Sequence, residues 1–234
     1  MKTQTTQRRG VPREYRSIYR VFNQLAVGTV FTLALALVGA ASAAAAQTVI
    51  AVLGDSLAAG FGLPAAQAFP ARLEAALRAG GADVRVINAG VSGDTSAGGR
   101  ARVDWLLGDE PDIVIVELGS NDSLRGLDPA ATLDNLDAIV ARLKDRNVSV
   151  MIAGMLAPRN LGREYADEFD AIYPRLAEKH DVMLYPFFLD GVALDPALNQ
   201  GDLIHPNQDG VEVIVQRLLP AARDLIDRHQ RLSN

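Results

Sequence analysis

The stretch TVIAVLGDS, residues 48–56, decides the class of fold. Its first six residues are almost all apolar and rich in β-branched side chains, without the alternation of a half-exposed strand. A continuous apolar run of this length predicts a strand buried on both faces, as in a parallel sheet. Gly54 and Asp55 permit a tight turn directly after it. The stretch therefore predicts an α/β protein in which Ser56 lies just beyond the carboxyl end of a strand.

Short apolar runs and longer segments of helical period alternate along the rest of the chain. The apolar runs predict further strands at residues 84–88, 113–118, 148–153 and 182–185. The segments between them predict helices at residues 66–78, 95–107, 129–146, 165–180 and 207–229, the last with a kink at Pro220. This alternation predicts a three-layer α/β/α sandwich around a parallel five-stranded sheet.

Polar and glycine-rich segments follow three of the predicted strands. Ser56 comes after the first strand, residues 90–93 after the second and Asn121 after the third. In open α/β sheets, sites form beyond the carboxyl ends of the strands, so these segments converge on one edge. His205 lies in a loop before the last helix, because Pro206 disfavours helix at the preceding residue, and it is free to reach the same edge.

Ser56, His205 and Asp202 together provide the groups that acyl transfer requires. A serine hydroxyl is the nucleophile, a histidine takes its proton, and a carboxylate orients the histidine and stabilises its charged form. Each residue alone has a structural interpretation: Ser56 as a helix N-cap, and Asp202 with His205 as a chance pair in a loop. Asp55 is interpreted as a turn or cap residue.

Asn121 is the candidate side-chain donor to an oxyanion, and Gly93 is a candidate backbone donor. The structural alternative for Asn121 is an Asx turn at the end of a strand. The segment around Gly93 is glycine-rich and precedes a helix, but it matches neither a P-loop nor a G-x-G-x-x-G motif. Ser92 is a second candidate nucleophile without a partner pattern. Glu117 lies within an apolar strand and would need a partner there.

The first 46 residues differ in kind from the rest. They carry a net charge of +5, followed by an uncharged apolar stretch at residues 25–40 and the small residues Ala41-Ser42-Ala43. This order predicts a secretory signal peptide over residues 1–46, cleaved near residues 43–47, and hence a periplasmic or secreted protein of a bacterium. The alternative is an uncleaved anchor, although the apolar run is slightly shorter than the ~18–20 residues of a membrane span.

Residues 47–234 are predicted to form a single domain with a net charge of −10, since the whole chain carries −5. A domain this acidic, without a basic run, is not expected to bind nucleic acid. The chain has no cysteine, which excludes a disulfide scaffold, a thiol nucleophile and a cysteine zinc site. We expect a monomer with no metal or cofactor and no stable membrane insertion after signal cleavage.

These segments resemble the conserved blocks of the GDSL or SGNH hydrolase family. Gly54-Asp55-Ser56-Leu57, Gly93, Asn121 and Asp202 with His205 stand at successive blocks, and residues 92–96 and 116–122 are similar to the thioesterase I, lysophospholipase and arylesterase branch. The resemblance implies a flavodoxin-like sandwich. It also implies Ser56, Asp202 and His205 as catalytic residues, and an oxyanion hole formed by the Ser56 N–H, the Gly93 N–H and the Asn121 amide.

The function expected from these residues is hydrolysis of carboxylic esters or thioesters through an acyl-enzyme intermediate, with a small acyl ester or thioester as substrate. A carbohydrate acetyl esterase is an alternative, because acetyl groups on sugars need the same chemistry. A secreted binding module that has lost activity is an alternative of another class. Loops at residues 156–163 and 190–201 are expected to wall the pocket, without revealing its specificity.

Overall fold

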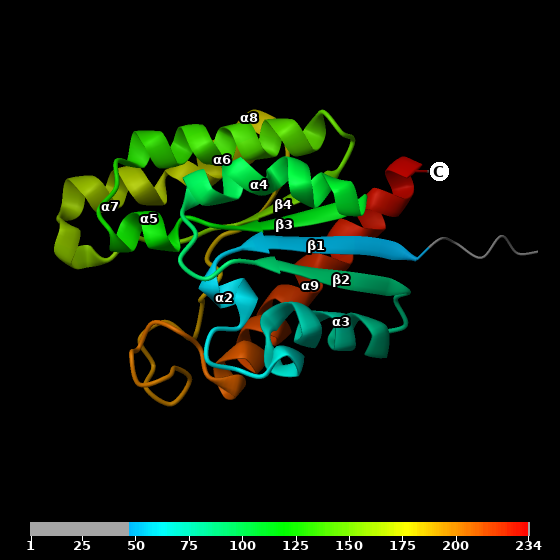
Figure 1. Cartoon of the computed structure of the whole chain (residues 1–234), viewed down its shortest axis with the longest axis horizontal. Coiled ribbons are helices and arrows are strands. Elements are labelled where there is room, and N and C mark those ends of the chain that lie inside the picture. The colour runs from blue at the N-terminus through cyan, green and yellow to red at the C-terminus, as the bar shows by residue number, and fades with distance from the viewer. Residues whose placement is uncertain (1–46, 234) are drawn as a thin grey trace, which may run out of the picture. The chain divides into compact units, whose positions relative to one another are not determined.

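The computed structural model describes residues 47–233. Within them a five-stranded sheet has the order β2-β1-β3-β4-β5, and all neighbouring strands are parallel (Figure 1). The strands are β1 (Thr48–Gly54), β2 (Val84–Gly90), β3 (Ile113–Glu117), β4 (Ser149–Ala153) and β5 (Met183–Tyr185). The predicted parallel α/β fold is therefore confirmed, with each expected strand present to within two residues at its ends.

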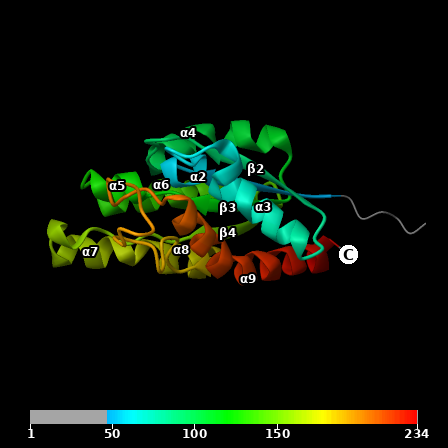
Figure 2. The ribbon, with the colours of Figure 1, turned by 90° about the horizontal axis from the view of Figure 1, so that it is seen from below.

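Helices cover both faces of this sheet (Figures 1 and 2). One layer contains α3 (Phe69–Ala79) and α9 (Gln208–Ser233). The other contains α4 (Ser96–Leu106), α6 (Pro129–Lys144) and α8 (Ile172–His180). Shorter elements are α2 (Ser56–Ala59), η1 (Ala65–Gln67), η2 (Leu107–Asp109), α5 (Ser120–Leu124), η3 (Arg159–Leu161) and α7 (Arg163–Asp170).

The apolar runs form the strands because they are covered on both sides. Every residue of β3 is buried, and six of the seven residues of β1 are buried. The two edge strands are more exposed: β2 alternates in part and β5 is half-buried throughout. Burial thus follows position in the sheet, as expected for a parallel sheet between two helical layers.

The register aligns the carboxyl ends of three neighbouring strands. Gly54 of β1 is paired with Gly90 of β2 and with Glu117 of β3. A Cβ atom at Gly90 would lie 2.2 Å from the backbone nitrogen of Ala59, so only glycine lets α2 pack this closely on β2. The segments that follow these three residues therefore start side by side.

One predicted helix is wrong in its extent. The helix expected over residues 165–180 is two helices, α7 and α8, which meet at Ala171. Pro174 explains the break, because it has no N–H to donate to Asp170 and its ring clashes with that carbonyl in a continuous helix. The short helices α2 and α5 were not expected, since one turn is too short to show a helical period.

The final helix, α9, continues from Gln208 to Ser233 and is not divided at Pro220, which lies inside it. Both Pro220 and Gln216, whose carbonyl loses its usual donor, are exposed, so water can satisfy that carbonyl. In residues 47–233, no helix has the length and apolarity needed to cross a bilayer. The predicted signal peptide, residues 1–46, lies outside the described residues.

Candidate active site

Ser56 is the first residue of α2 and follows the end of β1 by two residues. Asp55 caps this helix, since its side chain accepts a hydrogen bond from the Leu57 N–H at 3.0 Å. The helix ends after one turn at Gly60, whose φ of 78° lies in the left-handed region that glycine favours. Strand, cap and single turn together hold the Ser56 hydroxyl at the carboxyl edge of the sheet.

His205 lies 149 positions further along the chain, yet its ring contacts Ser56. The Nε2 atom is 2.8 Å from Ser56 Oγ, and the Nδ1 atom is 2.6 Å from Asp202 Oδ2. With Nδ1–H donating to the carboxylate, Nε2 is the nitrogen that accepts from the serine hydroxyl. The structure thus connects the three predicted residues in one continuous chain of hydrogen bonds.

The loop that carries His205 is fixed against the segment after α2. Asp202 Oδ1 accepts the N–H groups of Ile204 and His205, each at 3.0 Å. Gln200 Nε2 donates to the carbonyl of Phe61 at 2.7 Å. The Phe61 ring also packs beside the imidazole, with ring centroids 4.5 Å apart. These contacts hold the histidine in place next to the serine.

Asp202 is held in its ionised form by the same contacts. The backbone N–H of His205, the His205 ring and the Ile204 N–H lower the pKa of Asp202 to about 2. Hydrogen bonds to the charged form of a carboxylate have this effect because they stabilise the negative charge. Asp202 can therefore balance a positive charge on His205 over the whole range from weak acid upward.

Potential oxyanion donors surround the serine. Asn121, in α5, donates through Nδ2 to Asp55 Oδ2 at 3.1 Å and to the Asp94 carbonyl at 2.9 Å. Gly93 lies in the loop after β2 with a φ of 87°. In the part of the chain that the structure describes, neither the Ser56 N–H nor the Gly93 N–H has a protein acceptor. Both N–H groups are available to a ligand.

Two carboxyl groups are buried beneath the serine. Asp55 Oδ2 accepts hydrogen bonds from Ser120 Oγ and Asn121 Nδ2, while burial raises the pKa of Asp55. Glu117 Oε2 accepts the Asp55 N–H at 3.3 Å, and Oε1 has no partner within residues 47–233. Burial, and then the charge of Asp55, raise the pKa of Glu117 well above its ordinary value. The neutral form of Glu117 is therefore favoured.

A cavity of about 770 Å³ opens beside Ser56 and His205. Apolar side chains make up most of its wall: Leu57, Leu124, Met155, Leu156, Ala157, Pro158, Phe187, Leu189, Ala193, Leu194, Leu203 and Ile204. Both predicted loops contribute to it. Leu194 and Leu203 have φ angles of 63° and 60°, a conformation that costs a branched side chain energy, and Leu194 is 75% exposed. Two apolar side chains of the cavity wall, Leu194 and Leu203, are thus exposed to solvent although their backbone conformation is unfavourable.

The other candidates from the sequence lie away from this series. Ser92 is exposed in the loop after β2. His180 Nε2 is 2.7 Å from Asp137, and His229 Nδ1 is 3.0 Å from Ser149, so each of these rings contacts another segment. Within residues 47–233, no group of three or more His, Cys, Asp or Glu could hold a metal ion.

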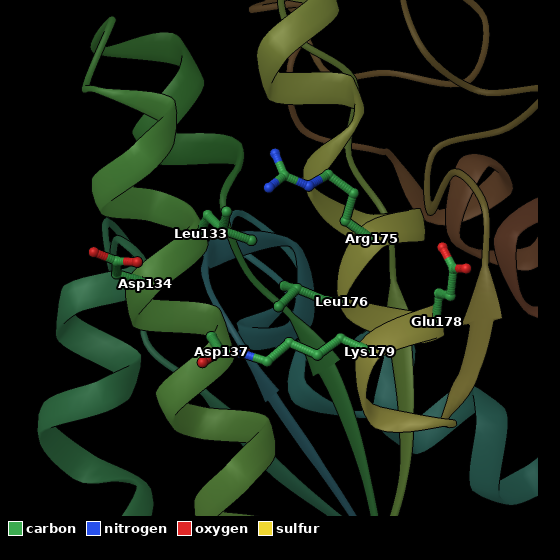
Figure 3. Close-up of a pocket in the computed structure, with 7 residues that line it drawn as sticks. All are labelled: Leu133, Asp134, Asp137, Arg175, Leu176, Glu178 and Lys179. Carbon is green, nitrogen blue, oxygen red and sulfur yellow. The ribbon is translucent and has the colours of Figure 1, made fainter.

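A second cavity, of about 510 Å³, lies between α6 and α8 (Figure 3). Its wall is mostly charged, and Figure 3 shows Lys179 pointing across it towards Asp137. The Lys179 Nζ and Asp137 Oδ1 atoms are 2.7 Å apart. None of the predicted site residues lines it. The seven residues that line this cavity include no serine, threonine or cysteine, and none of them lines the cavity beside Ser56.

Sequence reasoning did not find some residues that contact the site. Arg102 donates to two strand-end carbonyls and pairs with Asp94, but one arginine in an amphipathic helix gives no signal. Phe61 lies beside His205 and was not distinguishable from a core or surface aromatic residue. Ser120 lies within residues 116–122, which carry part of the family resemblance, and its contact with Asp55 is visible only in the folded structure.

A three-layer parallel α/β fold with a serine–histidine–aspartate series at the carboxyl edge of its sheet defines a class of ester hydrolases. Residues 52–213 match the model of the GDSL-like Lipase/Acylhydrolase family, and the chain belongs to that family. The resemblance noted from the sequence is thereby confirmed.

Characterised relatives cover most of the chain. An arylesterase of Vibrio mimicus is 40% identical over 183 residues, which are 76% of this chain and 92% of the relative. Thioesterase 1/protease 1/lysophospholipase L1 of Escherichia coli K12 is 41% identical over 186 residues, 79% and 88% of the two chains. The crystal structure of AlinE4, an SGNH-hydrolase family esterase, is 49% identical with a TM-score of 0.65, covering 76% of this chain and 96% of that one.

Proposed function

We propose that this protein hydrolyses acyl esters and thioesters with Ser56 as nucleophile, His205 as general base and Asp202 as the group that orients it. Ser56 Oγ bonds to the carbonyl carbon while its proton moves to His205 Nε2. His205 gives that proton to the alcohol or thiol as the bond to the leaving group breaks. Water then attacks the acyl-enzyme, passing its proton through His205, and releases the carboxylic acid.

The observation that carries this proposal is the unbroken hydrogen-bonded series from Ser56 through His205 to Asp202, at 2.8 Å and 2.6 Å. These are the contacts that proton transfer from the serine requires. The proposed oxyanion hole consists of the Ser56 N–H, the Gly93 N–H and the Asn121 amide. It is supported by the two backbone donors that have no protein acceptor in the described residues.

The apolar cavity supports acyl chains rather than acetyl groups as the bound part of the substrate. At about 770 Å³ it is within the range of sites for drug-sized ligands, far larger than one methyl group needs. Its wall is mainly apolar, with the polar side chains of Ser120, Asn121, Ser123, Arg159 and Asn160 beside Ser56 and His205. An esterase or thioesterase for longer acyl chains is therefore favoured over the carbohydrate acetyl esterase, and the names of the relatives are those of an esterase and a thioesterase.

The test is hydrolysis of p-nitrophenyl esters from acetate to palmitate by residues 47–234, beside the Ser56→Ala and Ser92→Ala variants. We expect Ser56→Ala to abolish turnover and Ser92→Ala, an exposed serine in the loop after β2, to leave it unchanged. Rates should rise with chain length beyond acetate. Full activity of a folded Ser56→Ala variant would refute the mechanism, and a sharp preference for acetate would refute the acyl-chain assignment.

We further propose export by a signal peptide over residues 1–46, followed by action as a monomer in the periplasm or outside the cell. The basic start, apolar core and Ala41-Ser42-Ala43 support export. The series from Ser56 through His205 to Asp202 needs no residue of a second copy, so a monomer is sufficient for the proposed chemistry. Mass spectrometry of the expressed protein should find an N-terminus near residues 43–47, and gel filtration should give one chain's mass. An intact N-terminus in the membrane fraction would favour the anchor instead.

A further inference from the structure

Arg102, on α4, bonds three separate segments at the edge of the sheet. Its Nη2 donates to the Gly54 carbonyl at 2.8 Å, and its Nη1 donates to the Ala89 carbonyl at 2.7 Å. Its Nε pairs with Asp94 Oδ2 at 2.7 Å. One guanidinium thus joins the ends of β1 and β2 to the loop after β2.

Two of these three acceptors lie close in the chain to residues of the proposed machinery. Gly54 lies two residues before Ser56, and Asp94 directly follows Gly93. Asp94 has a second role, because its carbonyl accepts the Asn121 amide at 2.9 Å. Through Gly54 and Asp94, Arg102 is therefore connected to the segments that carry all three proposed oxyanion donors. Arg102 itself makes no hydrogen bond to Ser56, Gly93 or Asn121 in the described residues.

We propose that Arg102 is a positioning residue that sets the spacing of the oxyanion donors, acting through Asp94 and the Gly54 carbonyl. This inference rests on the proposed function, because it assumes that Ser56, Gly93 and Asn121 surround the reacting carbonyl. Donors of this kind stabilise the transition state only when they are fixed where the charge develops. Removing the Arg102 bonds to Asp94 and to the Gly54 carbonyl should therefore slow the chemical step more than it weakens substrate binding.

The geometry of the contacts requires arginine. A guanidinium offers five N–H donors in a rigid plane and can serve three acceptors in different directions. Lysine has one ammonium group on a flexible stem, which can keep the pair with Asp94 but not both carbonyl bonds in the same arrangement. The Arg102 and Asp94 side chains are only 18% and 19% exposed, so water does not readily replace the lost bonds.

A purely structural ion pair would behave differently from a positioning residue. Arg142 and Asp104 provide a more exposed comparison on the same helix, since Nε and Oδ1 are 2.6 Å apart, Asp104 is also on α4, and the two side chains are 42% and 70% exposed. That pair joins α4 to α6 without contacting the strand ends. Its removal reports what the loss of an arginine–aspartate pair on this helix does by itself.

The experiment measures kcat, KM and melting temperature on a p-nitrophenyl ester for Arg102→Met, Arg102→Lys, Arg142→Met and Ser56→Ala. We expect Arg102→Met to lower kcat by roughly 10²-fold, the loss typical of a small misplacement of catalytic groups. KM should change little. Arg102→Lys should recover part of the loss and stays available if the methionine variant does not fold. Arg142→Met should keep the wild-type kcat.

Combining Arg102→Lys with Asn121→Ala shows whether the arginine acts through the donors. If it does, the double variant loses less than the product of the two single losses, because the second change disturbs a site already impaired. Losses that multiply would overturn the inference. So would wild-type kcat in both Arg102 variants while Ser56→Ala is inactive. An active Ser56→Ala would instead refute the proposed function.

Discussion

The side-chain NH2 group of Asn121 donates hydrogen bonds to two protein oxygens, the Asp94 carbonyl and Asp55 Oδ2. Its bond to the Asp94 carbonyl, at 2.9 Å, is shorter than its bond to Asp55 Oδ2, at 3.1 Å. Asp55 Oδ2 also accepts from Ser120, so it keeps a partner if Asn121 turns one hydrogen towards a substrate. One N–H bond, to the Asp94 carbonyl, therefore holds the amide in place. The other N–H can leave Asp55 and donate to an oxyanion when one forms.

Asn121→Ala removes this donor without removing a large buried side chain. We expect kcat to fall by roughly 10² to 10³, the effect of losing one oxyanion donor. KM and the melting temperature should change little. Steady-state kinetics on a p-nitrophenyl ester, with circular dichroism to verify folding, measures both. Turnover near that of the wild type would exclude Asn121 from the mechanism.

Asp202→Asn tests the carboxylate next to His205. We expect kcat to fall by roughly 10⁴-fold, because an amide does not favour the same ring tautomer or balance the charged ring. The folded-state pKa of Asp202, about 2, lies below its ordinary value of 3.8. The stability that the charge contributes is therefore present above pH 3.8 and lost as the pH falls through about 2.

Urea unfolding of the wild type and Asp202→Asn from pH 6 to pH 2 measures this linkage. The difference in unfolding free energy between the two proteins should shrink only towards the acid end of the range. A difference that stays constant to pH 2, or grows there, would contradict the assignment of the low pKa to Asp202.

At the scale of elements, the position of Ser56 depends on how closely α2 packs on the sheet. The helix has a single turn, so its own hydrogen bonds contribute little stability. It is held by the Asp55 cap and by the close approach to Gly90, where a Cβ atom would lie 2.2 Å from Ala59 N and 2.8 Å from the Ala58 carbonyl carbon. Both are backbone atoms, which cannot rotate away.

Gly90→Ala should therefore displace α2 and the serine with it. We expect a loss of about 1–3 kcal/mol in the free energy of unfolding, as for overpacking elsewhere, together with a fall in kcat. Gly108→Ala is the matched control, because a Cβ atom there meets nothing within 4 Å. Chemical denaturation and ester kinetics on both variants check this. Equal behaviour of the two variants would show that α2 is not constrained by Gly90.

At the scale of the whole molecule, one buried acid makes the stability depend on pH. Glu117 is fully buried at the carboxyl end of β3, where a Cβ atom added at Gly54 would lie 2.4 Å from its Oε2. Its pKa is raised by burial and by the charge of Asp55. Above pH 4.5 the unfolded chain loses this proton while the folded protein keeps it, so the folded state becomes less stable as the pH rises towards the raised pKa.

Glu117→Gln removes this proton and its pH dependence. We expect the unfolding free energy of the variant, relative to the wild type, to increase as the pH rises above 4.5 and to level off at the raised pKa, with a limiting slope of about 1.4 kcal/mol per pH unit between them. Urea unfolding at half-unit steps from pH 5 to pH 8 gives the slope. Glu168→Gln, at an exposed position of α7, is the control for replacing a glutamate outside the core. A flat difference for Glu117→Gln would show that Glu117 ionises in the folded protein.

Much of the fold was predictable because it depends on local patterns. The runs at residues 48–53 and 113–118 have the apolarity of strands covered on both faces, and parallel connections then place Ser56 and Asn121 at one edge. The break between α7 and α8 was missed although Pro174 is visible in the sequence. A proline within the first turn of a helix is common, and only the meeting of the two helices at Ala171 distinguishes that case from a continuous helix.

The strands, the helical layers and the sheet edge that carries Ser56, Gly93 and Asn121 follow from the amino-acid sequence, because side-chain periodicity is local and strand–helix–strand connections obey general rules. The contact of His205 with Ser56 across 149 positions, the closeness of Glu117 to Gly54 and the bonds from Arg102 to two strand ends and Asp94 are visible only in the folded structure. Such contacts depend on loop conformation and on how the layers pack. No periodic pattern records them, since each is a single meeting of residues far apart in the chain.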